Sequence, residues 1–227
     1  SICAGDSAIL NGSGAVSYTW DNGITDGVHF VPSVANTYTV TGTDGNGCEN
    51  TDQVAITVNA LPTIEAGLDQ TVCEGDTVTL SGTGASSYTW DNGVSDGVGF
   101  PPLSTATYMV TGTDGNGCEN TDQVDVNVNA LPTVGAGANQ TVCEGDTVTL
   151  SGTGASSYTW DNVVSDGVTF TPVSTAVYTV IGTDGNGCIN SDQVEVTVNV
   201  LPTVNAGTDI SICAGDSAIL NGSGAVS

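Results

Sequence analysis

The chain has 227 residues, with 25 Asp and Glu but no Lys or Arg, so its formal net charge at pH 7 is -25. Without cationic side chains it cannot neutralise phosphates or anionic lipid headgroups, which excludes nucleic acid and direct membrane contact as partners. The same composition excludes salt bridges to Lys or Arg and Lys–Asn isopeptide bonds within the chain.

The cysteines mark an internal repeat of 70 residues without insertion or deletion. One series is Cys3, Cys73, Cys143 and Cys213, and the other is Cys48, Cys118 and Cys188. We therefore predict a module at 1–60 that lacks its first strand, complete modules at 61–130 and 131–200, and the first strands of a truncated fourth module at 201–227. Residues 1–17 recur letter for letter at 211–227. We expect the chain to be a window from a longer tract with a period of 210 residues.

Within a module the apolar residues alternate with polar ones, which predicts strands with one buried face. In the copy at 131–200 the inward residues are expected to be, in chain order, Val148, Leu150, Tyr158, Trp160, Tyr178, Val180, Val194, Val196 and Val198. Turn sequences separate these runs, and the Asp-Gly-Asn-Gly stretch at 184–187 is typical of a hairpin. No segment has helical spacing. Many short strands with such turns predict an all-β Ig-like sandwich.

Adjacent modules are joined by Asn-Ala-Leu-Pro-Thr or Asn-Val-Leu-Pro-Thr, with no Gly/Ser linker. Proline restricts its own φ and favours extended backbone in the residue before it. We therefore expect the sandwich modules to follow one another end to end as a rod. Neighbouring repeats of the same chain are then the principal partners, and rods are able to bundle laterally.

A sandwich of 70 residues buries only a modest core, so covalent cross-links should matter to its stability. Each complete module has one early cysteine and one 45 positions later. This pattern predicts disulfides within modules, with the partner of Cys213 beyond the end of the chain. The predicted pairs are Cys3–Cys48, Cys73–Cys118 and Cys143–Cys188. Such pairs indicate an oxidising, extracellular compartment.

Three segments of the second copy carry a resemblance to a known family. They read AGLDQTVCEGDTVTLSG at 66–82, SYTWDNGVSDG at 87–97 and TYMVTGTDGNGC at 107–118. They resemble the PKD-like and Ig-like repeats of secreted surface proteins from Bacteroidota. The resemblance implies the stalk of a very large cell-surface adhesin, of the kind used in gliding motility. The cysteine pair and the WDNGVSDG loop depart from the PKD pattern, which leaves PKD and generic Ig-like topology as alternatives.

The candidate catalytic and metal-binding residues are one histidine and the Asp and Asn residues of the Trp-Asp-Asn loops. His29 is the only histidine, and Gly99 and Thr169 replace it in the other copies, so we interpret it as a surface residue of a protein that is not an enzyme. No cofactor is expected other than calcium, whose preferred oxygen ligands gather in the Trp-Asp-Asn loops. Ordinary turn chemistry is the alternative for these loops. The calcium candidates are Asp21, Asn22, Asp26, Asp91, Asn92, Asp96, Asp161, Asn162 and Asp166.

Each module also has one Asp-Ser/Thr-apolar triplet, which matches the O-glycan acceptor pattern of Bacteroidota. The acceptor hydroxyls would be those of Ser7, Thr77, Thr147 and Ser217. Strand alternation should point these hydroxyls outward, although outward Thr is also common in strands without a glycan.

Three functions fit this sequence. The first is a stalk or filament segment of an adhesin that provides reach and stiffness. The second is a non-covalent filament in which residues 201–210 donate the strand missing from the first module. The duplicated seventeen residues disfavour this, because a donated strand needs no second copy of its acceptor's start. The third is a carbohydrate-binding accessory module, which would require exposed aromatic side chains.

Overall fold

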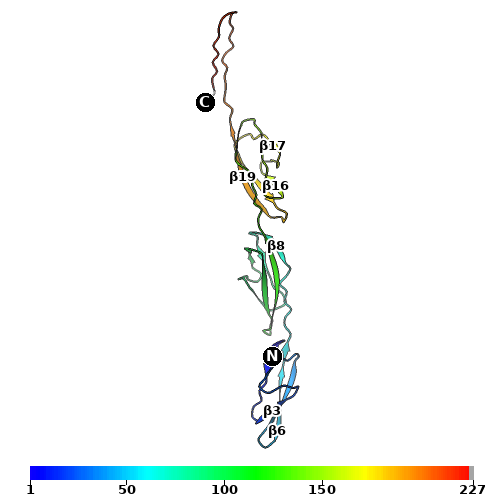
Figure 1. Ribbon diagram of the computed structural model, residues 1–227. Coiled ribbons are helices and arrows are strands. Elements are labelled where there is room, and N and C mark those ends of the chain that lie inside the picture. Colours follow the sequence, from blue (N-terminus) through cyan, green and yellow to red (C-terminus); the bar gives the residue numbers. More distant parts are fainter. Residues whose placement is uncertain (225–227) are drawn as a thin grey trace. The chain divides into compact units, whose positions relative to one another are not determined.

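The computed structural model describes residues 1–224, and all regular secondary structure in this part of the chain is β-strand (Figure 1). The chain divides into two compact units, Ser1–Asn129 and Ala130–Ser227. Unit 1 contains the first and second modules, and unit 2 contains the third module followed by residues 201–224. In the described part of the chain, no helix could cross a membrane.

The second module is a two-sheet sandwich. Its strands are β8 (Gln70–Cys73), β9 (Val78–Thr79), β10 (Ser87–Trp90), β11 (Gly99–Phe100), β12 (Ala106–Thr113) and β13 (Glu119–Asn129). One sheet has the order β10-β12-β13-β8, and β9 pairs with β11 in the other. An antiparallel bridge between Glu65 and Thr83 joins the start of the module to the segment that follows β9. The first full strand, β8, is parallel to the last, β13, while the other pairs are antiparallel.

The third module repeats this topology in unit 2, and the first module has most of it. The third module comprises β14 (Gln140–Cys143), β15 (Val148–Thr149), β16 (Ser157–Trp160), β17 (Thr169–Phe170), β18 (Ala176–Thr183) and β19 (Ile189–Asn199). The first comprises β1 (Ile2–Cys3), β2 (Ala8–Ile9), β3 (Ser17–Trp20), β4 (His29–Phe30), β5 (Asn36–Thr43), β6 (Glu49–Ile56) and β7 (Val58–Asn59). The predicted fold class, tandem all-β Ig-like sandwiches, is confirmed; the end-to-end rod remains a prediction.

The core of the third module lies where the alternation placed it. In the third module Val148, Leu150 and Val180 are 3%, 1% and 0% exposed, and Trp160 is 7% exposed. Val194 and Val196 of β19 complete the same cluster. The Asp-Gly-Asn-Gly turn joins β18 to β19 as a hairpin, in which the Asp184 N–H donates to the Cys188 carbonyl over 3.0 Å. The strands and turns predicted for this copy are therefore present.

Candidate functional site

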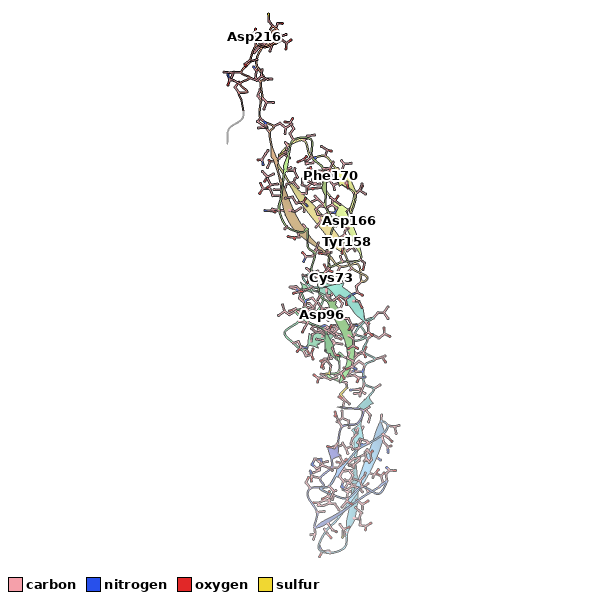
Figure 2. The ribbon with its side chains drawn as sticks, turned by 45° about the horizontal axis from the view of Figure 1, so that its top comes forward. Cys73, Asp96, Tyr158, Asp166, Phe170 and Asp216 are labelled. Carbon is pink, nitrogen blue, oxygen red and sulfur yellow. A yellow bond between two sulfur atoms is a disulfide. The ribbon has the colours of Figure 1, made fainter. Side chains whose placement is uncertain are left out.

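The Trp-Asp-Asn loop, predicted as a calcium candidate, is held by hydrogen bonds to its own carboxylates. In the second module, Asp96 Oδ1 accepts the indole N–H of Trp90 at 2.9 Å and the backbone N–H of Gly82 at 2.7 Å. Asp26 and Asp166 do the same in their modules. Figure 2 marks Asp96 and Asp166. The Trp20 and Gly12 hydrogen bonds lower the pKa of Asp26.

The remaining calcium candidates also stabilise turns. Asp91 Oδ1 accepts the Met109 N–H at 3.0 Å, which ties the loop to β12. Asn92 adopts a φ of 53°, in the left-handed region that Asn tolerates better than most residues. Asp21, Asn22, Asp161 and Asn162 repeat these two roles. Within residues 1–224 no group of three or more His, Cys, Asp or Glu is arranged to hold a metal ion. Calcium binding remains a prediction for these loops.

Other predicted positions lie on the surface. His29 is exposed, as predicted, and the hydroxyl of Ser7 lies 3.5 Å from its Nδ1. The four predicted glycan acceptors, Ser7, Thr77, Thr147 and Ser217, are all exposed. The Asp before each of the first three has a structural role of its own, since its carboxylate accepts a cysteine N–H at 2.9 to 3.0 Å. O-glycosylation remains a prediction.

A surface hollow of about 500 Å³ lies in the second module beside Phe100, Leu103 and Tyr108, and no Asp, Glu, His or Cys lines it. The aromatic rings supply no exposed platform either. All Trp, Tyr and Phe side chains of the chain lie within the described residues, and each is buried or half-buried.

A disulfide joins two modules, in place of the predicted pairs within modules. Cys3 of the first module is bonded to Cys118 of the second, with a Cα–Cα distance of 5.5 Å and a sequence separation of 115 residues. The predicted pairs Cys3–Cys48 and Cys73–Cys118 are therefore wrong. Cys143–Cys188 is wrong too, because Cys143 is free. Cys73 and Cys188 are also disulfide-bonded.

Strand register explains this correction. Because β1 is parallel to β7, Cys3 lies opposite Asn59 at the end of the module's last strand. Cys48 directly precedes β6, which β7 follows after one residue, so it lies at the other end of this last strand segment. Eleven residues of extended chain separate the two positions, or about 35 Å at 3.3 Å per residue. The two cysteines of a module thus mark its opposite ends, so a bond can form only to a neighbouring module. The period of 70 was visible in the sequence, but the parallel pairing that decides the ends was not.

The bonded and free cysteines differ in exposure. Cys118 and Cys188 are 0% and 1% exposed. Cys48, Cys143 and Cys213 are free and exposed. Four disulfide-bonded cysteines indicate folding in an oxidising compartment outside the cytoplasm.

Comparison with known proteins identifies other chains of Ig domains. No family model matches, and no curated protein does. The insect immune protein hemolin matches 81% of this chain and 68% of its own, at 14% identity and a TM-score of 0.35. The N-terminal eight Ig domains of Down syndrome cell adhesion molecule match 98% of this chain and 43% of theirs, at 15% identity and a TM-score of 0.29. Immunoglobulin domains 1–5 of Sidekick-1 match 82% and 52%, at 14% identity and a TM-score of 0.28, so this chain spans about half of that structure.

Proposed function

We propose that the chain is a structural segment of the stalk of a very large secreted cell-surface adhesin, which serves adhesion or gliding motility by giving reach and stiffness. The observation that carries this proposal is the Cys3–Cys118 disulfide. It gives the joint between the first and second modules a second covalent connection beside the backbone. A cross-link at that place restricts bending of the joint and limits how far the chain can extend under load.

The similarity of the copies supports a spacer. The modules at 61–130 and 131–200 differ at only sixteen of seventy positions, and their buried residues are equivalent. A module specialised for binding would be expected to stand out from its neighbours. Repetition of one unit instead increases length, and the interactions of such a protein then belong to other regions.

The carbohydrate-binding alternative lacks its main requirement. Sugar platforms use exposed aromatic rings, whereas Trp90 and Trp160 are 9% and 7% exposed and each indole N–H is used within its own module. The resemblance of the repeats to tracts in gliding-motility adhesins also favours the stalk.

Single-molecule stretching tests the proposal. Handles attached at the two ends of the chain would pull it to full extension with and without a reducing agent. Because the Cys3–Cys118 disulfide encloses 115 residues, and because reduction also breaks the bonds of Cys73 and Cys188, reduction should lengthen the extended chain by at least about 400 Å at roughly 3.5 Å per residue. A chain whose modules extend freely without measurable resistance, whether oxidised or reduced, would not be a load-bearing stalk.

A further inference from the structure

The covalent route through unit 1 is much shorter than its backbone. Cys3 follows Ser1 after one intervening residue, and its disulfide leads directly to Cys118 of the second module. Cys118 is followed at once by β13, which ends at Asn129, the last residue of unit 1. A force between Ser1 and Asn129 can therefore pass through the disulfide and the 11 residues of β13 alone. The backbone route also includes the 115 residues that the disulfide spans.

β13 is straight and has almost no slack. It runs without interruption from Glu119 to Asn129, and its sequence contains neither Gly nor Pro. An extended strand rises about 3.3 Å per residue, and a fully stretched chain reaches at most about 3.6 Å per residue. Opposed forces at the two ends of β13 can therefore lengthen this strand by only about 3 Å.

β13 also lies inside its sheet, with a neighbour on each side. The strand order is β10-β12-β13-β8. Eight antiparallel residue pairs join β13 to β12, and four parallel pairs join it to β8. Opposed forces at the two ends of one strand act along that strand and do not slide it past its neighbours. Such a force leaves the hydrogen bonds between the strands unloaded.

The fold fixes both ends of this strand. At the first end, the Asp114 N–H donates to the Cys118 carbonyl at 2.9 Å, and Asp114 Oδ1 accepts the Cys118 N–H at 2.9 Å. At the other end, the Glu74 N–H donates to the Asn129 carbonyl at 2.8 Å. The disulfide and the exit of the chain are therefore held at opposite ends of the second module.

The rest of both sandwiches belongs to a closed loop. Residues 4–117 leave the short route at Cys3 and return to it at Cys118, and the Cα atoms of these two cysteines are 5.5 Å apart. Because the two cysteines are bonded, a force along the short route cannot separate them. The loop holds the buried cluster of the first module and all of the second module's cluster that precedes β13.

We propose that tension applied along unit 1 passes through the Cys3–Cys118 disulfide into β13 and bypasses the remaining strands of both sandwiches. The two modules then stay folded under a force that would unfold them if it were applied across their sheets. This inference rests on the proposed function as a stalk, and it specifies how the stalk transmits force. Stiffness at this joint comes from one covalent bond and one straight strand.

Without the disulfide the same tension would load the sheets in shear. It would enter the first module at β1 and leave at β7, and these two strands are parallel. In the second module it would enter at β8 and leave at β13, which are parallel as well. The pulled ends of each pair point in opposite directions, so the force would slide one strand along the other. The pairs are only two and four residues long, which makes them the weak points that the bypass protects.

The test pulls single full-length chains with the disulfide intact and changes only the place where force is applied. One handle is attached to the α-amino group of Ser1, which is the only primary amine in a chain without Lys. The other is attached through an azide side chain introduced at Ala130 or, for the matched comparison, at Leu61. Both positions are exposed. Attachment by this chemistry leaves all cysteines unmodified.

The two attachments should behave differently at the same force. With handles at Ser1 and Leu61, the closed loop is pulled near its middle and both sandwiches are loaded. Each half of the loop holds about half of the 115 residues, so unfolding should lengthen the chain by up to about 200 Å at roughly 3.5 Å per residue. The force is raised until this attachment yields. With handles at Ser1 and Ala130 we expect no lengthening step at that force, and steps of similar size in both attachments would overturn the proposal.

Cys118→Ser removes the bypass while keeping the handles at Ser1 and Ala130. This variant should lengthen by about 400 Å at or below the force at which the Ser1–Leu61 attachment yields, because all 115 residues then enter the route. A variant that stays as short as the unchanged chain would overturn the proposal. The comparison of attachments uses the intact disulfide, so it holds even if this variant folds poorly.

Val110→Ala distinguishes a bypass from a fold that is merely strong. Val110 of β12 is 0% exposed, so its truncation leaves a cavity and weakens the second module. The unfolding force should fall with handles at Ser1 and Leu61, and the response with handles at Ser1 and Ala130 should not change. A new lengthening step in the Ser1–Ala130 attachment would show that the sandwich carries the tension after all.

Failure of the bypass is distinct from failure of the stalk. Unfolding steps at a measurable force between Ser1 and Ala130 would refute the bypass, yet they would still describe a chain that resists tension. The stalk itself fails only if the chain extends freely, without measurable resistance, in every attachment.

Discussion

Cys118 follows the turn between β12 and β13 of the second module, and its sulfur is bonded to that of Cys3 in the first module. Cys118 is fully buried, and its N–H donates to Asp114 Oδ1 at 2.9 Å. The hairpin therefore holds the cysteine at the end of its module. This arrangement fastens one module to the next, and it makes the stability of unit 1 depend on oxidation.

Loss of this disulfide should destabilise unit 1. Cys118→Ser is expected to lower the free energy of unfolding by about 2 to 5 kcal/mol, since the chain-entropy model gives about 4.7 kcal/mol for a loop of about 100 residues. Thermal denaturation followed by near-UV circular dichroism would measure this. Cys48→Ser changes the equivalent but free cysteine of the first module and should have little effect. A comparable loss from both variants would contradict the assignment of the bond.

Val163 is predicted to be a site of backbone strain in the third module. Its φ is 62° and its side chain is fully exposed, whereas glycine occupies the equivalent positions 23 and 93 with φ of 74°. A β-branched residue is disfavoured in this region. Val163→Gly should therefore stabilise the third module by about 1 kcal/mol, and Gly93→Val should destabilise the second by a similar amount. Chemical denaturation of each variant checks both signs, and a destabilising Val163→Gly would contradict the strain.

Acid should weaken the hairpins. Backbone N–H groups of Cys118 and Asn116 lower the pKa of Asp114, and those of Cys48 and Asn46 lower the pKa of Asp44. Because the folded pKa lies below the unfolded value of about 3.9, this stabilisation is present above that pH. It is lost as the pH falls through the folded pKa.

Melting temperatures from pH 2 to 7 would reveal this acid limb. Asp114→Asn should make the decline below about pH 4 shallower. Glu74→Gln removes an exposed carboxylate that accepts no described hydrogen bond, and it serves as the control for the general loss of charge. If both variants followed the same pH profile, the hairpin carboxylates would not be responsible.

Calcium removal tests the Trp-Asp-Asn loops. Asp96 and Asp91 already accept N–H donors from Trp90, Gly82 and Met109. Because these hydrogen bonds hold the loop through its own carboxylates, we expect a chelator to shift the melting temperature by less than about 2 °C, which corresponds to well under 1 kcal/mol for a domain of this size. A larger fall on chelation, restored by calcium but not by magnesium, would establish the loops as calcium sites.

The sequence predicted local features better than long-range ones. Val148, Leu150, Val194 and Val196 lie inside because strand alternation alone fixes their face. The Asp184 hairpin follows from its own four residues. The pairing of Cys3 could not be predicted in this way, because it depends on the parallel register of β1 and β7 and on a contact 115 residues away. Likewise, the acceptor role of Asp122 toward Ala66 depends on the order of strands in the sheet.

Disulfide mapping of the intact chain tests the central claim most directly. The chain has no Lys or Arg, so trypsin has no site; pepsin at low pH would cleave it while suppressing thiol exchange. We expect a peptide containing Cys3 to be recovered in disulfide linkage with one containing Cys118, and Cys48 to be recovered as a free thiol. Recovery of Cys3 linked to Cys48, and of Cys73 linked to Cys118, would show that each module is closed on itself and would contradict the fastened joint.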